Sequence, residues 1–300
     1  MMRKKKISAF DIINYSLMIL LMAAFVIPFW IIIAASVSDN GTLQAEGISL
    51  QIKRFTFEAY EFLFTMNDIF IRSIGVSFLT SLLTALLSVA VCTLAAYVLS
   101  KKYLVGRKFF TVIFMITMFF SGGTIPTYLL IRGIGIYDTI WALVLPGVVS
   151  TYNILLIRNY FYGLPDAMEE AAKIDGASDV DVLIRIFAPL SVPMMCTIGI
   201  MTFIGKWNEW LPSLLYLGAT NKSLWTAQYV LRQMLRDMQT LFGNAAGGSV
   251  VNAPLIASKN AAIVVVVLPL IVMSPVLHKY FVKKLRTCVK FFNESLNIRH

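Results

Sequence analysis

The chain has 300 residues, of which 58% are hydrophobic and only 14% are charged, and its mean hydropathy is +0.75. Soluble domains are typically about 45–50% apolar and about 25% charged, so this composition excludes an ordinary soluble protein and indicates a membrane protein. The formal net charge of +10 would in a soluble chain suggest a nucleic-acid partner. Its meaning here depends on where the basic residues lie.

Six apolar segments are long enough to cross a bilayer as helices, which takes about 20 residues each. They cover approximately residues 11–35, 73–99, 109–131, 138–157, 189–217 and 260–282. The first follows a basic cluster, residues 3–6, but its apolar run exceeds the about 7–15 residues of a signal-peptide core. We therefore expect an all-α polytopic membrane protein, with residues 1–300 forming one transmembrane domain of six spans.

Lysine and arginine residues set the orientation of these spans, because they are enriched in cytoplasmic segments. With the N-terminus in the cytoplasm, most of the 26 basic residues fall inside, so orientation explains the charge and no nucleic-acid partner is predicted. Both termini are then cytoplasmic. The longer loops 36–72 and 218–259 lie outside, where residues 225–240 read as an amphipathic helix with Leu231, Met234, Leu235 and Met238 on one side.

The loop 158–188 is predicted to be cytoplasmic, and it contains EEAAKIDGASDVDVLIRIFAPL, residues 169–190, the most polar interior stretch. Asp166 after Pro165, with Glu169 three residues later, predicts a capped helix start. Gly176 ends this helix. A second start follows at Ser178 with Asp181, and an apolar face continues until Pro189 begins the next span: Val180, Leu183, Ile184 and Phe187. The loop is therefore a helix, a glycine turn and a second helix.

Two interpretations of this helix pair remain open from its residues alone. It could be a solvated connector resting on lipid headgroups. It could also dock a cytoplasmic partner, because Ala171 and Ala172 allow close approach while Glu169 and Glu170 can make charge-assisted contacts with a basic groove.

The sequence then shows a specific resemblance. Glu170-Ala171-Ala172, Gly176, Ile186 and Ala188-Pro189 resemble the EAA loop of ABC-importer permease subunits, although that family usually has leucine where Ala188 stands. Further segments resemble the carbohydrate-importer permeases, closest to the complex-oligosaccharide branch of Gram-positive bacteria: 120–128, 141–143, 158–161, 175–178 and 207–208. The stretch after Lys283 matches less well.

The resemblance implies a transmembrane permease subunit of an ATP-driven sugar or oligosaccharide importer in a bacterial cell membrane. Its implied partners are a second homologous permease, two cytoplasmic ATPase subunits that use ATP and Mg²⁺, an extracytoplasmic solute-binding lipoprotein and membrane lipid. No cofactor would be bound by this chain itself. The residues implied to couple it to the ATPase are Glu169, Glu170, Ala171, Ala172, Asp175 and Gly176.

The sequence offers no basis for a catalytic or metal site, and no enzyme activity is predicted. No GxxxxGK[ST] phosphate loop or Gly-x-Ser-x-Gly motif is present. The two histidines, His278 and His300, and the three separated cysteines form no metal-binding or redox pattern.

Two regions are candidates for lining a transport pathway. Trp207, Asn208 and Glu209 are either anchors at the outer membrane interface or the outer wall of a sugar route. Gly122 and Gly123, close to Pro126 and Tyr128, predict either a packing kink or a bent segment that lines the route.

The alternative function is a stand-alone channel or secondary transporter without an ATPase partner. Secondary transporters commonly carry internal repeats and intramembrane carboxylates, whereas the spans here have no evident repeat and almost no central carboxylates. A non-transporting scaffold is a third alternative. The sequence does not specify the sugar, the identity of the ATPase, or whether this chain touches the substrate.

Overall fold

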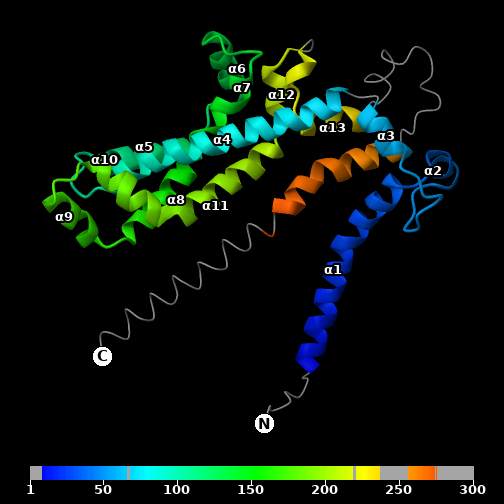
Figure 1. Ribbon diagram of the computed structural model, residues 1–300, viewed down its shortest axis with the longest axis horizontal. Coiled ribbons are helices and arrows are strands. Elements are labelled where there is room, and N and C mark those ends of the chain that lie inside the picture. Colours follow the sequence, from blue (N-terminus) through cyan, green and yellow to red (C-terminus); the bar gives the residue numbers. More distant parts are fainter. Residues whose placement is uncertain (1–8, 66–67, 219–220, 237–255, 274, 276–300) are drawn as a thin grey trace. The chain divides into compact units, whose positions relative to one another are not determined.

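The computed structural model describes residues 9–65, 68–218, 221–236, 256–273 and 275 (Figure 1). In these residues the regular secondary structure is helical, apart from one isolated antiparallel bridge between Ser38 and Phe55. This confirms the all-α class. The chain divides into two compact units: Met1–Ile71 with Leu231–Leu268, and Arg72–Val230 with Pro269–His300.

The first unit contains α1 (Ala9–Ser36), α2 (Asn40–Glu46) and α3 (Glu58–Thr65). Asp39 caps α2, because its carboxylate accepts a hydrogen bond from the Thr42 backbone N–H at 2.8 Å. Asn40 in turn accepts a bond from the backbone N–H of Ile256 at 3.0 Å, which ties this segment to the helix Ile256–Met273.

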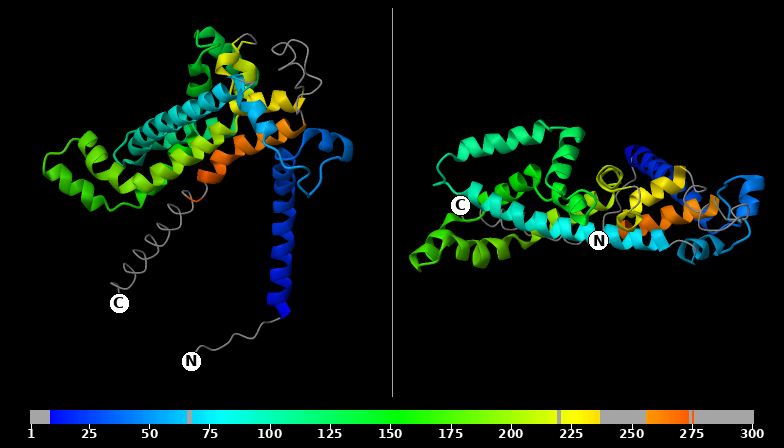
Figure 2. Two further views of the ribbon diagram at one scale, coloured as in Figure 1. Left: turned by 45° about the vertical axis from the view of Figure 1, so that its right-hand side comes forward. Right: turned by 90° about the horizontal axis from the view of Figure 1, so that it is seen from above.

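The second unit is organised around the long helix α4 (Asp68–Ser100). The elements that follow it, in chain order, are α5 (Arg107–Phe119), α6 (Thr124–Gly133), α7 (Ile140–Val144), η1 (Leu145–Gly147), α8 (Thr151–Tyr162), α9 (Asp166–Ile174), α10 (Asp179–Val182), η2 (Leu183–Phe187), α11 (Ala188–Trp207), α12 (Leu211–Tyr216), η3 (Lys222–Leu224) and α13 (Ala227–Arg236). Figures 1 and 2 show α4, α8 and α11 running side by side.

An apolar core holds these three helices together. Cys92 and Ala96 of α4 pack with Ile154 and Ile157 of α8, and Ile198 of α11 completes the contact, all of them fully buried. At the end nearer α9, Tyr97, Phe161 and Phe187 form a cluster of edge-to-face rings. Such ring pairs add stability beyond the area that they bury, so α8 and η2 are firmly attached to the end of α4.

Four helices of the described residues are long and apolar enough to cross a membrane: Phe10–Ser36, Asp68–Ser100, Asp179–Trp207 and Ile256–Met273. Two bent pairs bring the number to six if each pair is one span: Arg107–Phe119 with Thr124–Gly133, and Ile140–Gly147 with Thr151–Tyr162. The chain is therefore a multi-pass membrane protein.

The third and fifth predicted segments are not continuous helices. Segment 109–131 bends by 110° between α5 and α6, and 189–217 is interrupted between Trp207 and Leu211. Proline contributes to both breaks. Pro126 and Pro212 lack the N–H that would bond the carbonyl groups of Gly122 and Asn208, four residues earlier.

Two other predictions are covered only in part. The last predicted segment, 260–282, is described as helix to Met273, and its remainder lies almost wholly outside the described residues. The predicted helix 225–240 is found as α13, in which Leu231 and Met234 are buried but Leu235 is 47% exposed. Met238 lies outside the described residues.

Candidate functional site

The helix pair α9–α10 is polar, and its two helices turn about Gly176. Pro165, in extended conformation, precedes α9 and suits the start of a helix, where its missing N–H costs nothing. Gly176 has φ of +83°, a left-handed conformation that side chains with a Cβ disfavour. The predicted glycine turn is therefore confirmed, with Ala177 N–H bonding back to the carbonyl of Ala172 at 2.9 Å.

The second helix begins with the predicted capping box. The Ser178 hydroxyl accepts from the Asp181 backbone N–H at 3.2 Å, while the Asp181 carboxylate accepts from the Ser178 backbone N–H at 3.3 Å. Helix formation then continues without a break from Asp179 to Trp207. The predicted boundary at Pro189 is thus absent, because a π-helical segment, Leu183–Phe187, leads directly into α11.

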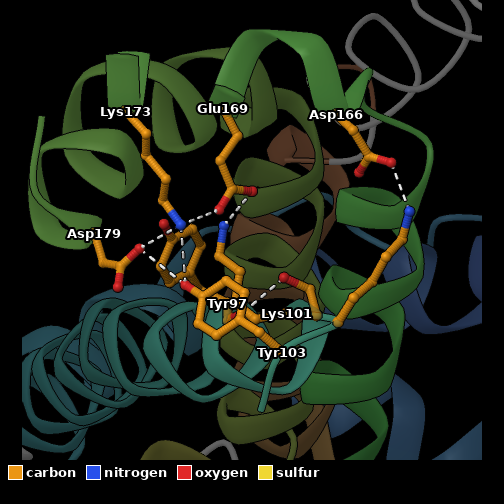
Figure 3. A network of polar contacts seen from close by, with 9 residues as sticks. Tyr97, Lys101, Tyr103, Asp166, Glu169, Lys173 and Asp179 are labelled. Atoms are coloured by element: carbon orange, nitrogen blue, oxygen red, sulfur yellow. Dashed lines mark hydrogen bonds and ion pairs between the residues drawn. The ribbon is translucent and has the colours of Figure 1, made fainter. Parts of the chain in front are cut away.

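A buried lysine fastens α9 to the end of α4 (Figure 3). Lys101 follows α4 directly, and its ammonium donates to Glu169 Oε2 at 2.7 Å. The same ammonium lies 3.8 Å from the ring centre of Tyr97 and 4.4 Å from that of Phe187. The side chain of Lys101 is only 6% exposed and that of Glu169 16%. Ring faces and carboxylate together therefore replace the water that the ammonium has lost.

Lys173 extends this network across the glycine turn. Its ammonium lies 3.0 Å from Glu169 Oε1 and 3.2 Å from Asp179 Oδ1, so it joins α9 to the first residue of α10. Tyr103 donates its hydroxyl proton to Asp179 at 2.9 Å. These side-chain contacts fix the angle between α9 and α10 (Figure 3).

The surroundings shift the pKa values of the three central groups. Burial lowers the pKa of Lys101, and the hydrogen bond and charge of Glu169 offset only part of that effect. Burial also acts to raise the pKa of Glu169, but hydrogen bonds from Lys101 and Lys173 outweigh it and the net shift is downward. The hydrogen bond to Glu169 raises the pKa of Lys173. The cluster is therefore built around an ionised carboxylate.

One detail of the predicted helix start is wrong. Asp166 and Glu169 do not form a capping pair: Asp166 bonds Lys102 at 2.5 Å, and Glu169 bonds Lys101 and Lys173. Both carboxylates still lie in the first turn of α9, where the helix dipole favours negative charge.

The helix pair also carries large apolar side chains that are exposed to solvent. Ile174 is 86% exposed, and Val180 and Ile184, one helical turn apart, are 63% and 62% exposed. Val180 and Ile184 were predicted on the same apolar face as Leu183 and Phe187. The structure instead buries Leu183 and Phe187 together with Val182, and leaves the other two outside.

The predicted coupling residues other than Ala171 line two hollows of this helix pair. Ala172, Asp175 and Gly176 line a groove of 430 Å³ that Asp181 and Arg185 also border. Glu169 and Glu170 line a second pocket of 320 Å³ beside Lys101. Glu170, Ala171 and Asp175 are exposed, whereas Glu169 is turned into the network.

The predicted pathway residues lie in two separate parts of the fold: the α5–α6 connection with α6, and the end of α11. Gly122 and Gly123 are exposed in the connection between α5 and α6, where Gly123 has φ of +87°. Pro126 is exposed in the first turn of α6. Tyr128 is half-buried against Tyr137, with ring centres 6.0 Å apart.

The residues at the end of α11 have three different environments. Trp207 is buried and stacks on Phe203 at 6.1 Å. Asn208 is exposed and accepts a hydrogen bond from Gln228 at 3.2 Å. Glu209 pairs with Lys206, whose ammonium is 2.6 Å away, and Lys206 is itself buried.

Sequence reasoning missed Lys101 and Lys206 as site residues. Lys101 stands in a basic group beside a span, which is the ordinary sign of a topology-setting charge. No local signal pairs it with Glu169, which is 68 residues away. The signal for Lys206 was available, since a lysine inside an apolar segment with Glu209 three positions later is an ionisable pair at helical spacing.

The structure thus shows several helices of membrane-spanning length together with a polar helix pair, α9–α10. Residues 94–287 match the family described as "Binding-protein-dependent transport system inner membrane component", and the chain belongs to that family. It is therefore a permease subunit of an ABC importer, a membrane component and not an enzyme.

Individual relatives agree with this assignment along most of the chain. Protein LplC of Bacillus subtilis (strain 168) is 36% identical over 91% of this chain and 92% of its own length. The polygalacturonan/rhamnogalacturonan transport system permease protein YtcP of the same organism is 33% identical over 91% of this chain and 95% of its own. A chain of the crystal structure of a bacterial ABC transporter involved in the import of the acidic polysaccharide alginate matches with a TM-score of 0.82 at 26% identity, covering 94% of this chain and 99% of that one.

Proposed function

We propose that this permease imports a carbohydrate and that α9–Gly176–α10 is the element through which an ATPase drives it. The carbohydrate assignment is supported by the names of relatives, which transport polygalacturonan or rhamnogalacturonan in one case and alginate in another. Six spans, with both termini and the loop 158–188 in the cytoplasm, follow from the basic residues beside the apolar segments. The bent pairs α5–α6 and α7–α8 supply two of these spans.

The complex contains, on this proposal, a second permease, two ATPase subunits and an extracytoplasmic solute-binding lipoprotein. A solute-binding partner agrees with the name of the family. ATP and Mg²⁺ are used by the ATPase subunits. The family assignment also weighs against a stand-alone channel or secondary transporter, because neither depends on a binding protein.

One observation carries the coupling proposal: the helix pair is held to α4 by buried ion pairs and also exposes large apolar side chains. Its inner side is held by Lys101, Glu169 and Lys173, whereas its outer side presents Ile174, Val180 and Ile184 to solvent. Exposed apolar side chains of this size beside carboxylates suit a protein partner with an apolar groove and basic rim.

The inner network provides a mechanism for transmission. When the ATPase closes on ATP, the docked pair moves with it, and the ion pairs and aromatic contacts pass the motion to α4 and α8. Continuous helix from Asp179 to Trp207 passes it to the fifth span without a hinge at Pro189. The spans then shift between inward-facing and outward-facing arrangements.

The proposal is tested by purifying the tagged chain from its own membranes in detergent. We expect an ATPase, a second permease and a solute-binding lipoprotein to be recovered with it, and the purified complex to hydrolyse ATP faster when the lipoprotein carries its sugar. Recovery of the chain alone from intact, transport-competent membranes would contradict the proposed assembly.

A further inference from the structure

Three basic residues lie where the start of α5 meets the end of α8. Arg107 and Lys108 begin α5, and Arg158 stands one turn before the end of α8. The two helices pack against each other. The guanidinium carbon of Arg107 lies 5.9 Å from the ring centre of Tyr162, and that of Arg158 lies 5.4 Å from the same ring. Two guanidinium groups therefore gather about one tyrosine.

The positive charges of this group are not neutralised by the described part of the chain. The two lysines that follow α4 each pair with a carboxylate of α9. In contrast, no described carboxylate lies within ion-pair distance of Arg107, Lys108 or Arg158. A charge that only sets topology need not be gathered with others. Like charges held close together repel each other, so this group favours an anionic ligand.

Arg158 is held in place but keeps a nitrogen that a ligand can reach. Its Nη1 donates to Thr111 Oγ1 at 3.1 Å, which fixes the plane of the guanidinium, and its Nε is buried. Its Nη2 is neither buried nor bonded to a described residue. Arg107 is half-buried and Lys108 is exposed. The group is therefore accessible from outside the fold.

The depth of this group favours a lipid over a soluble partner. Thr111, which accepts the bond from Arg158, already lies in the apolar run that forms the first half of a bent span. Val105, Phe109 and Phe110 beside it are 90%, 66% and 45% exposed, and such side chains suit contact with acyl chains. Basic groups between membrane helices on the cytoplasmic side bind anionic lipid head groups.

We propose that Arg107, Lys108 and Arg158 bind the phosphate-bearing headgroup of an anionic phospholipid in the cytoplasmic leaflet. The inference rests on the topology in the proposed function, which places this end of α5 and α8 inside the cell. A zwitterionic headgroup is disfavoured, because it would bring its own cation to the three basic residues. The bound headgroup ties α5 to α8, one helix from each bent pair.

The test measures lipid binding to the chain purified from its own membranes with the subunits that accompany it. The protein in detergent is titrated with phosphatidylglycerol or phosphatidylcholine, and native mass spectrometry counts the bound lipids. Arg107→Gln and Arg158→Gln each remove one charge, whereas Arg158→Lys keeps it. Arg132→Gln is the matched control, because Arg132 also lies beside tyrosine rings, those of Tyr128 and Tyr137, but at the end of α6.

We expect the wild-type protein to bind phosphatidylglycerol more tightly than phosphatidylcholine. Each arginine-to-glutamine change in the group should weaken phosphatidylglycerol binding about 5-fold, the effect of one basic residue near an anionic surface, and leave phosphatidylcholine binding unchanged. Arg158→Lys should retain most of the binding, since lysine also attracts phosphate as a point charge. Arg132→Gln should behave as wild type.

Several results would overturn the inference. Equal binding of the two lipids, or phosphatidylglycerol binding that is insensitive to both glutamine variants, would reject the site. Equal loss in Arg158→Lys and Arg158→Gln would show that the residue acts through packing and not through its charge. Displacement of the lipid by millimolar inorganic phosphate would identify a site for soluble phosphate. Loss of the accompanying ATPase with unchanged lipid binding would identify a protein contact.

A separate measurement distinguishes failure of the lipid site from failure of the proposed topology. Val105→Cys, at an exposed position beside the group, is treated with a membrane-impermeant maleimide in intact and in permeabilised cells, with the unsubstituted chain as control. We expect labelling at this position only after permeabilisation. Labelling in intact cells would contradict the topology and the cytoplasmic leaflet, even if lipid binding still depended on Arg107 and Arg158.

Discussion

Two buried lysines in this protein are each paired with a glutamate, but the two ion pairs have different structural roles. Lys101 and Glu169 are 68 residues apart and both largely buried, with Glu169 16% exposed and shared with Lys173. Lys206 and Glu209 are three residues apart, and Glu209 is 46% exposed at a pocket. The first pair joins α9 to the end of α4, whereas the second joins the last turn of α11 to a residue just after that helix.

The comparison shows that an ion pair's role depends on what it connects. Removing one member of a long-range buried pair leaves a charge without water and releases an element of the fold. Removing one member of the local pair leaves a carboxylate that can be hydrated. The effects of mutating the two lysines should therefore be very different.

The largest effect is expected for Lys101→Met, which keeps the apolar stem but removes the ammonium. Glu169 would retain only Lys173, and the free energy that holds α9 against α4 should fall by about 3 kcal/mol, the lower end for a broken buried pair. Amide hydrogen exchange in α9 should accelerate about 100-fold, limited by the original stability of the helix.

The matched control for this change is Lys206→Met, which should cost only about 1 kcal/mol because Glu209 remains exposed to water. Exchange in α9 should not change in this variant. Equal effects of the two substitutions on α9 would show that the Lys101 pair does not fasten the helix.

Gly176→Val should cost about 1–3 kcal/mol, since a β-branched residue is strained at φ of +83°. Membrane insertion should be normal, but transport per ATP hydrolysed should fall because the turn sets the shape of the docking pair. Gly176→Asn is the control, because asparagine tolerates the left-handed conformation and should retain most transport. Normal transport by the valine variant would contradict a role for this turn.

Glu170→Lys changes an exposed side chain without removing a member of the Lys101–Glu169–Lys173 network. It should weaken ATPase binding about 10-fold, or about 1.4 kcal/mol, through repulsion of a basic groove. Glu58→Lys, at an exposed position of α3, should have no effect. Recovery of the ATPase on purification measures both, and equal recovery would indicate a mainly apolar contact.

Titration of Glu169 is expected to have the smallest effect, because it changes nothing near neutral pH. Its pKa is lower in the folded state than in the unfolded chain, where glutamate titrates at about 4.3. Its stabilising contribution is therefore complete above that value and is lost as pH falls through the folded pKa. Exchange in α9, corrected for the intrinsic rate, should be constant from pH 7 to 5 and rise below about 4. Glu169→Gln should abolish this rise.

Much of this architecture could be predicted from local sequence. Apolar length identified the membrane segments, Gly176 identified the turn, and Ser178 with Asp181 identified the second helix start. The breaks near Pro126 and Pro212 also have a local signal in the sequence. Counting apolar residues does not detect them, so each segment was predicted as one helix.

What could not be predicted depends on contacts between distant residues. Glu169 has the sequence position of a capping residue, yet Lys101 draws it away because the folded chain brings the end of α4 beneath α9. Likewise Val180 and Leu183 share an apolar pattern, and only the packing of α8 and α4 decides that Leu183 is covered while Val180 stays exposed.

The most direct test of the central claim is photo-crosslinking from the exposed side of the helix pair. Benzoylphenylalanine would replace Ile184, with Leu129 of α6, 60% exposed, as the control position. In the intact importer, illumination should join position 184 to the ATPase subunit, with a yield that changes when ATP is added, and position 129 should give no such product. An assembled, transporting complex in which position 184 never reaches the ATPase would contradict the claim that energy enters through α9–α10.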